Sequence, residues 1–160
     1  MGWWVQGIGV RGALPAGVAV DGNNDFQLPW SPDAGWSWAT LAEDWERDLE
    51  RMAADTAAAA GAPVLAFVIA DSDLAILHGA APGEPPVVAS TGEYEEPGPP
   101  TQAAEFAAWT ERHAPRAVAA ERFDEWAETS YVFAEEGLAY LLGQMGLVEP
   151  SAQPPETLGV

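Results

Sequence analysis

Short apolar runs separated by turn-forming residues open the chain. Residues 3–10 interleave Trp, Val and Ile with Gly and Gln, and residues 16–20 repeat this composition after the turn-like segment 12–15. Apolar runs of strand length that are bounded by Gly and Pro are typical of β-hairpins. The pattern therefore predicts two short strands, followed over 21–35 by an ordered loop rich in Gly, Asn, Asp and Pro.

The strongest helix signal follows this loop. Thr40 and Glu43 have the spacing of a capping box, in which side chains satisfy backbone N–H groups of the first turn. The run 57–60 consists of Ala, and Gly61 is placed to end the helix. We therefore predict one amphipathic helix over 41–60. Its apolar face is formed by Leu41, Trp45, Leu49 and Met52.

The most apolar part of the chain comes next. Residues 64–70 and 74–78 are almost continuously apolar around the polar segment 71–73. This pattern predicts a β-hairpin at the centre of a sheet, buried on both faces. Residues 86–89 predict a shorter strand nearer the edge, and the acidic, Pro-rich segment 90–100 predicts a surface loop.

Three helices are predicted in the last third of the chain. Ala content and aromatic spacing indicate a helix over 101–113, and Pro115 interrupts it or begins the next helix, which extends to Glu128. The last helix is predicted over 131–144, with Gly146 as a C-terminal cap.

The order of these elements predicts the fold class. Strands, one helix, more strands and then a run of helices indicate a single α+β domain over 1–149. We expect a largely antiparallel sheet of about four or five strands, with about four helices packed on at least one face. The Pro-rich tail, 150–160, is expected to be mobile.

Composition supports a folded domain. The 160 residues are 48% hydrophobic and include eight Trp, which lies well outside the composition of disordered chains. The absence of Cys excludes thiolate catalysis and Cys-based zinc sites. The sequence shows neither a basic leader before an apolar run nor a segment long enough to cross a membrane, so we expect a cytoplasmic protein.

Net charge is the most informative number. Asp and Glu total 25 against six basic residues, all of them Arg, which gives a formal charge of −19. Such a field repels nucleic acid and anionic membranes and accelerates encounter with cationic surfaces. The expected partner is therefore a basic protein, without direct nucleic-acid or membrane binding.

Candidate catalytic residues are few. Asp71 and Asp73 at a strand end superficially resemble the metal-binding Asp pairs of nucleotide-sugar glycosyltransferases and haloacid-dehalogenase-type phosphatases. Leu74 follows the second Asp, where the phosphatase pattern usually has Thr or Val, and the chain has no Lys to neutralise a phosphate. Because an apolar strand resumes directly after Asp73, we predict that residues 71–73 form a turn. His78 and His113 lack the spacing of a triad or a metal motif. We therefore predict a protein that is not an enzyme, with no catalytic residue, metal or cofactor.

Acidic clusters and aromatic side chains provide the candidate binding residues. The acidic clusters predict an extended negative surface suited to a cationic cleft. Alternation places Trp36 and Trp38 on the same side of an extended segment, where they could form one apolar contact. The predicted charges are Glu43, Glu46, Glu50, Glu93, Glu95, Glu96, Asp124, Glu125 and Glu128, and the predicted aromatic anchors are Trp36, Trp38 and Tyr94.

The layout, size and acidity resemble those of actinobacterial immunity proteins of polymorphic toxins. Residues 132–138 and their continuation to Leu142 resemble helices of such proteins. The resemblance implies an immunity protein that occludes the cationic active cleft of a toxin such as a nuclease. The alternatives are a DNA mimic that inhibits nucleic-acid-binding proteins, a structural component of a larger assembly, and a metal-dependent enzyme using Asp71 and Asp73.

Overall fold

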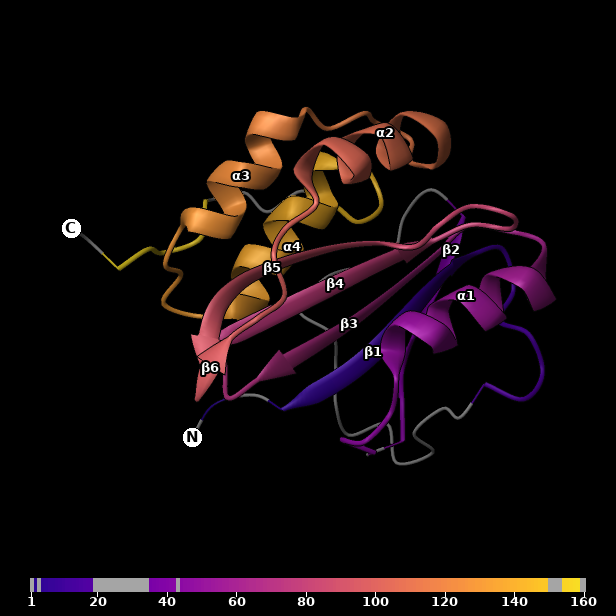
Figure 1. Ribbon diagram of the computed structural model, residues 1–160, viewed down its shortest axis with the longest axis horizontal. Helices are drawn as coiled ribbons and strands as arrows, with labels where there is room; N and C mark the ends of the chain where they lie inside the picture. The colour runs from indigo at the N-terminus through magenta and orange to yellow at the C-terminus, as the bar shows by residue number, and fades with distance from the viewer. Residues whose placement is uncertain (1, 3, 19–34, 43, 150–153, 159–160) are drawn as a thin grey trace.

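The predicted α+β class is confirmed. The computed structural model describes residues 2, 4–18, 35–42, 44–149 and 154–158, and among them it shows one antiparallel sheet and four helices (Figure 1). The strand order is β2-β1-β3-β4-β5-β6, with β6 only two residues long. The strands are β1 (Val5–Arg11), β2 (Trp36–Thr40), β3 (Val64–Ala70), β4 (Leu74–Ala80), β5 (Val87–Tyr94) and β6 (Glu96–Pro97). The helices are α1 (Leu49–Ala60), α2 (Ala103–His113), α3 (Ala120–Glu128) and α4 (Ala134–Gln144).

The hairpin of β3 and β4 occupies the centre of the sheet, as predicted. Residues 71–73 connect the strands, and Asp71 and Ser72 have φ angles of 51° and 59°. The N–H of Asp73 donates to the carbonyl of Ala70 at 3.0 Å. A β-turn whose two central residues both have positive φ angles matches the right-handed twist of paired strands. The polar segment is therefore a tight turn, which confirms the sequence interpretation.

Helices cover both faces of this hairpin. Leu65 and Phe67 face one way and pack in a core with α2, α3 and α4, whereas Val64 and Ala66 face the other way and pack against α1. Figure 1 shows α2, α3 and α4 gathered on one side of the sheet and α1 on the other. The predicted burial on both faces is confirmed, and it explains why the strands are apolar at successive positions.

The partner of β1 differs from the prediction. Residues 16–18 form no strand, and β1 pairs instead with β2, where Arg11 lies opposite Trp36. Gly17 has a φ of 93°, a conformation of turns rather than strands. The predicted loop over 21–35 lies outside the described residues except at Gly35, as do residues 19 and 20 of the predicted strand.

Helix α1 begins eight residues later than predicted, at Leu49 rather than 41. Its N-cap is Asp48, whose side chain accepts a hydrogen bond from the N–H of Arg51 at 3.0 Å. Thr40 ends β2, and the N–H of Leu41 continues the sheet by donating to the carbonyl of Gln6. Pairing with β1 therefore overrides the local helical pattern.

The other helix ends follow the sequence more closely. Gly61 ends α1 in a left-handed conformation, with a φ of 63°, as predicted. Helix α2 matches its predicted range within two residues, whereas α3 begins at Ala120 rather than at Pro115 and α4 at Ala134 rather than at Tyr131. None of the helices in the described part of the chain is long and apolar enough to cross a membrane.

Strand β5 is longer than predicted and takes in residues assigned to a loop. Ser90, Thr91 and Gly92 continue the ladder with β4, where Gly92 pairs with Leu74, and the last two residues of β5 pair with β6. Glu95, with a φ of 60°, then turns the chain into β6. Only the later part of the predicted loop lies outside a strand.

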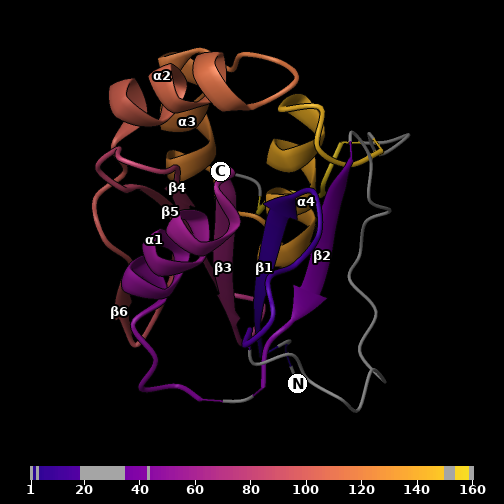
Figure 2. The same ribbon diagram turned by 90° about the vertical axis from the view of Figure 1, so that its right-hand side faces the viewer.

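The two ends of the sheet differ in what they carry. We call the end with the start of β1, the end of β2, the β3–β4 turn and the end of β5 the near end, and the opposite end the far end. The start of β1 and β6 both lie at this near end, which is the lower end of the sheet in Figure 2. The described tail, 154–158, also lies beside residues 130–132, where the N–H of Val132 donates to the carbonyl of Glu156. The mobility of the tail and the single-domain boundary stay predictions.

A close contact between β1 and β3 gives a test of the core. Gly7→Ala should destabilise the protein by about 1–3 kcal/mol, because overpacking a core is costly and the added Cβ would lie 2.2 Å from Cζ of the fully buried Phe67 ring. The measurement is the free energy of urea unfolding. In a Phe67→Leu background the same substitution should cost less, and strictly additive costs would contradict the contact.

Candidate functional site

Three aromatic side chains from separate segments meet at the near end. The ring of Trp4 makes edge contacts with Tyr94, at a centroid distance of 4.7 Å, and with Trp45, at 5.4 Å. Trp4 and Trp45 are 44% and 42% exposed, and Tyr94 is half-buried. We call these residues the aromatic triad.

The sheet topology brings the triad together. Trp4 directly precedes β1, and Tyr94 ends β5 on the other side of the central hairpin. Trp45 lies in the connection between β2 and α1, in a turn whose Asp44 side chain accepts a hydrogen bond from the N–H of Glu46 at 3.2 Å. Each residue lies at the end of a strand or in a turn, and the rings of Trp4 and Trp45 are exposed there.

Exposed acidic side chains flank two members of the triad in the sequence, Trp45 and Tyr94. Of the six arginines, all of which the structure describes, only Arg47 belongs to a segment that carries a triad residue, and its guanidinium donates to Oε1 of Gln6 at 3.1 Å. The near end is therefore negative around an apolar centre. The exposed acidic residues on the triad segments and on the neighbouring turn are Asp44, Glu46, Asp73, Glu93, Glu95 and Glu96.

A pocket adjoins this surface between β5 and the start of α4. Its volume is about 300 Å³, and the acidic residues Asp73 and Glu93 line it. Glu93 directly precedes Tyr94 in β5, so the side chains of the pocket residue and of the triad residue point to opposite faces of the sheet. The remaining lining residues are Thr91, Gly92, Ser130, Tyr131, Ala134 and Leu158. We call this cavity the acidic pocket.

The structure divides the predicted acidic residues among several surfaces. Glu46 and the three glutamates of 93–96 join Tyr94 at the near end, whereas Glu50 lies on α1, close enough to His78 to act on the imidazole charge. Glu43 lies outside the described residues. The predicted residues on α3 are exposed on the other face of the sheet, and they are Asp124, Glu125 and Glu128.

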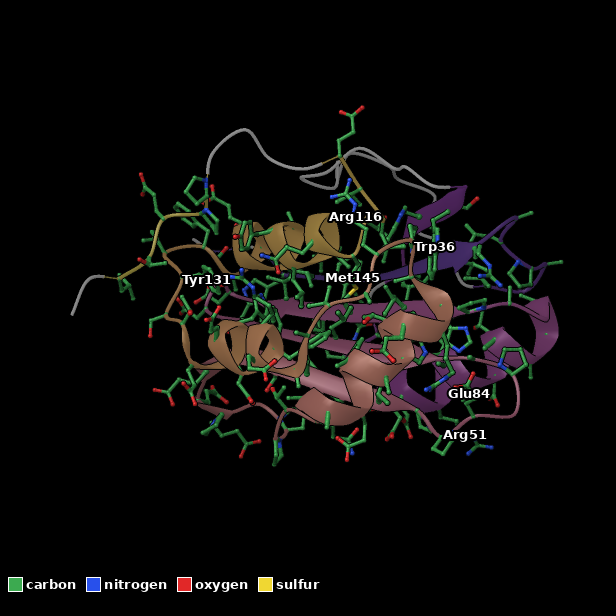
Figure 3. All side chains as sticks on the ribbon, turned by 90° about the horizontal axis from the view of Figure 1, so that it is seen from above. Trp36, Arg51, Glu84, Arg116, Tyr131 and Met145 are labelled. Atoms are coloured by element: carbon green, nitrogen blue, oxygen red, sulfur yellow. The ribbon has the colours of Figure 1, made fainter. Side chains whose placement is uncertain are left out.

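Trp36 and Trp38 belong to the core rather than to the exposed surface. Their rings stack at a centroid distance of 6.1 Å, which confirms that they share one side of the chain. Trp36 is only 4% exposed and lies toward the far end, as Figure 3 shows, and Trp38 packs against Phe67. Trp36 is therefore not an exposed anchor, because strand β2 places both rings over the sheet.

Trp4 and Trp45 are exposed aromatic residues that the sequence analysis did not predict as candidate binding residues. The helical pattern placed Trp45 on a buried face, and Trp4 was one of several apolar residues in the first strand. Two signals were present in the sequence. Consecutive Trp residues in an extended chain point to opposite faces, and Asp44 is a residue that forms turns with its own backbone.

The β3–β4 turn has structural partners. Oδ1 of Asp71 accepts a hydrogen bond from the N–H of Gly2 at 3.0 Å, and the hydroxyl of Ser72 donates to Oε1 of the buried Glu135 at 3.0 Å. In the part of the chain that the structure describes, no three His, Asp or Glu side chains are grouped so that they could hold a metal ion.

The two histidines lie away from the triad. Burial lowers the pKa of His78, although Glu50 and Asp48 oppose this effect. His113 donates from Nε2 to Glu84, and the guanidinium of Arg112 lies 2.6 Å from the same carboxylate. Burial alone would raise the pKa of Glu84, but these hydrogen bonds outweigh it and the pKa is lowered. This cluster ties the β4–β5 loop to the end of α2.

A scan against protein-family models found no match, and neither the search of curated proteins nor the search of solved structures found a similar chain.

The Glu84 cluster predicts a specific pH dependence. Because the pKa of Glu84 is below its usual value of 4.5 in the folded state, the unfolded state binds the proton more tightly. The cluster therefore contributes stability above about pH 4.5 that is lost as the pH falls through the lowered pKa. In Glu84→Gln, the free energy of urea unfolding should fall less steeply with acid than in the wild type. Glu105→Gln, an exposed position on α2, the helix that carries Arg112 and His113, is the control, and identical acid slopes for Glu84→Gln and the wild type would contradict the prediction.

Proposed function

We propose that this protein binds and neutralises a basic protein, and that the aromatic triad with its acidic surroundings is the contact surface. Exposed aromatic groups ringed by charge are characteristic of protein interaction sites, where a ring supplies apolar area at a low entropy cost. The observation that carries the proposal is the contact of Trp4 with Trp45 and Tyr94 on the surface.

Charge complementarity favours a cationic partner. Carboxylates flank Trp45 and Tyr94, and the guanidinium of Arg47, beside them in the connection that carries Trp45, donates to Gln6. A cation that approaches the triad gains both from the carboxylates and from the electron-rich faces of the rings. The formal charge of −19 accelerates encounter with such a surface from a distance.

The finer proposal is that the partner is a toxin whose active cleft is cationic, and that the protein is its cytoplasmic immunity protein. An inhibitor of this kind needs no catalytic residue, because occlusion of the cleft is sufficient. The acidity of the chain and the acidic residues at the near end of its sheet support this proposal. It implies one dedicated partner, whereas a DNA mimic would bind several unrelated proteins.

The test is a pull-down from lysate of the source organism at low salt, followed by elution in a salt gradient and identification of the bound proteins. We compare the wild type with Glu93→Gln/Glu95→Gln/Glu96→Gln. The matched control is Glu105→Gln/Glu111→Gln/Glu121→Gln, which removes three exposed charges from α2 and α3. The wild type should retain one dominant basic protein, and the near-end variant should release it at lower salt than the control does.

Two outcomes would contradict the proposal. Equal elution of both variants would mean that net charge, rather than the near end, holds the partner. A mixture of unrelated nucleic-acid-binding proteins would favour DNA mimicry instead. If the dominant partner is an enzyme, its activity in the presence of an equimolar amount of this protein completes the test, because unchanged activity would exclude neutralisation.

A further inference from the structure

We propose that a groove beside α3 and α4 binds an extended, proline-containing segment of a partner protein, and that the described tail, 154–158, occupies this groove until such a segment displaces it. The groove has a volume of about 220 Å³. We call it the proline groove, and the lining residues that matter here are Trp126, Tyr131, Tyr140, Pro154, Pro155 and Thr157. The inference is independent of the proposed function, because it does not involve the aromatic triad.

The tail pairs with the loop between α3 and α4 as a strand would (Figure 1). The N–H of Val132 donates to the carbonyl of Glu156 at 3.0 Å, and the N–H of Leu158 donates to the carbonyl of Ser130 at 2.7 Å. Addition of an extended segment to exposed backbone is a recurring mode of peptide recognition, in which main-chain hydrogen bonds supply affinity. The loop therefore offers its backbone groups to any extended segment, and the tail is their occupant in this structure.

Side chains around the proline groove add a preference for proline. The bridge between the loop and the tail joins Tyr131 to Thr157. Pro154 and Pro155 line the same groove as Tyr131 and Tyr140. Proline-rich segments bind aromatic-lined grooves well, because their extended conformation exists before binding and little conformational entropy is lost. The tail thus shows the chemistry that the groove accepts, which is two consecutive prolines followed by a short strand.

Contacts within α3, α4 and their loop hold the aromatic wall in place. Trp126 is only 3% exposed, and its Nε1 donates to the carbonyl of Gly137 at 2.9 Å. The ring of Tyr131 packs on the same glycine, where an added Cβ would lie 2.5 Å from Cδ2 of the ring. The backbone of α4 at Gly137 therefore positions both rings, and neither contact requires the tail.

The tail itself is held weakly enough to be exchanged. Four of its five described residues are exposed, and Leu158 is 59% exposed. Among the residues that the structure describes, the bonds to Ser130 and Val132 are the two backbone hydrogen bonds of this tail. Segments with little burial and few hydrogen bonds open at a low cost in free energy. A partner segment that repeats the prolines and adds contacts of its own would therefore displace the tail.

The first test measures binding of a labelled, capped peptide with the sequence of residues 154–158 to the full chain by fluorescence anisotropy. Leu158→Pro should bind the peptide about fivefold more tightly than the wild type, because it removes the N–H that holds the tail at Ser130 and so frees the groove. Thr157→Pro is the matched control and should bind the peptide as the wild type does. The hydrogen bonds of this bridge come from the residues on either side of Thr157, so its own N–H points away from the loop.

Two further comparisons test the preference for proline. In the Leu158→Pro background, Tyr140→Leu should weaken peptide binding about fivefold through loss of an aromatic contact. Phe133→Leu, at an exposed ring outside the described lining of the groove, should leave binding unchanged. A peptide carrying Pro154→Ala/Pro155→Ala should bind more weakly than the natural sequence. Equal binding of the two peptides, or of one peptide to Leu158→Pro and the wild type, would overturn the inference.

A measurement on the wild type removes any dependence on how the variants fold. Excess unlabelled peptide added to the isotope-labelled chain should move the amide resonance of Leu158 toward its value in an unfolded chain, because the displaced tail loses its bond to Ser130. The amide of Val132 should stay hydrogen-bonded, because a carbonyl of the peptide replaces that of Glu156. An unchanged Leu158 resonance at saturating peptide would contradict displacement, and it would leave the proposed function standing.

Discussion

Burial of the central hairpin on both faces is the constraint on which the rest of the structure depends. Strands β3 and β4 are apolar at successive positions, so a helix on one face alone would leave the other face in water. Helix α1 covers Val64 and Ala66, while α2, α3 and α4 cover Leu65 and Phe67. With both faces enclosed, the surfaces of the sheet left for contact with other molecules are its ends and its edges.

The two ends of the sheet carry different chemistry for a topological reason. In an antiparallel sheet, alternate connections fall at the same end. The start of β1, the β3–β4 turn and the end of β5 therefore share the near end, together with their acidic residues and the aromatic triad. The far end holds the ion-paired cluster of Glu84 with Arg112 and the buried Trp36 (Figure 3). The ion-paired charges that stabilise the fold at the far end are thus separated from the acidic residues of the near end, which have no ion-pair partners among the described residues.

Structural features that depend on residues close together in the sequence were predicted correctly. Features that depend on pairing between distant segments were not. The hairpin turn at Asp71 and Ser72 and the end of α1 at Gly61 follow from residues within a few positions, and both were predicted. The start of α1 was wrong because Leu41 bonds to Gln6 on β1, a partner that no local periodicity reveals. The same limit applies to the site. The sequence predicts Glu93, Glu95, Glu96 and Tyr94 as binding residues, which stays a prediction. The contact of Trp4 with Trp45 joins segments about forty residues apart in the chain, so it requires the fold.

The position of the two ends of the described chain has a practical consequence. The N–H of Gly2 donates a hydrogen bond to the side chain of Asp71, and Leu158 forms part of the wall of the acidic pocket. Any tag, label or fused domain attached beyond either residue therefore leaves the protein beside the surface that we assign to partner binding, and it would shield that surface. The β4–β5 loop at Gly83, where the backbone is exposed and no neighbouring atom lies within 4 Å of a Cβ position, is the better place for a probe.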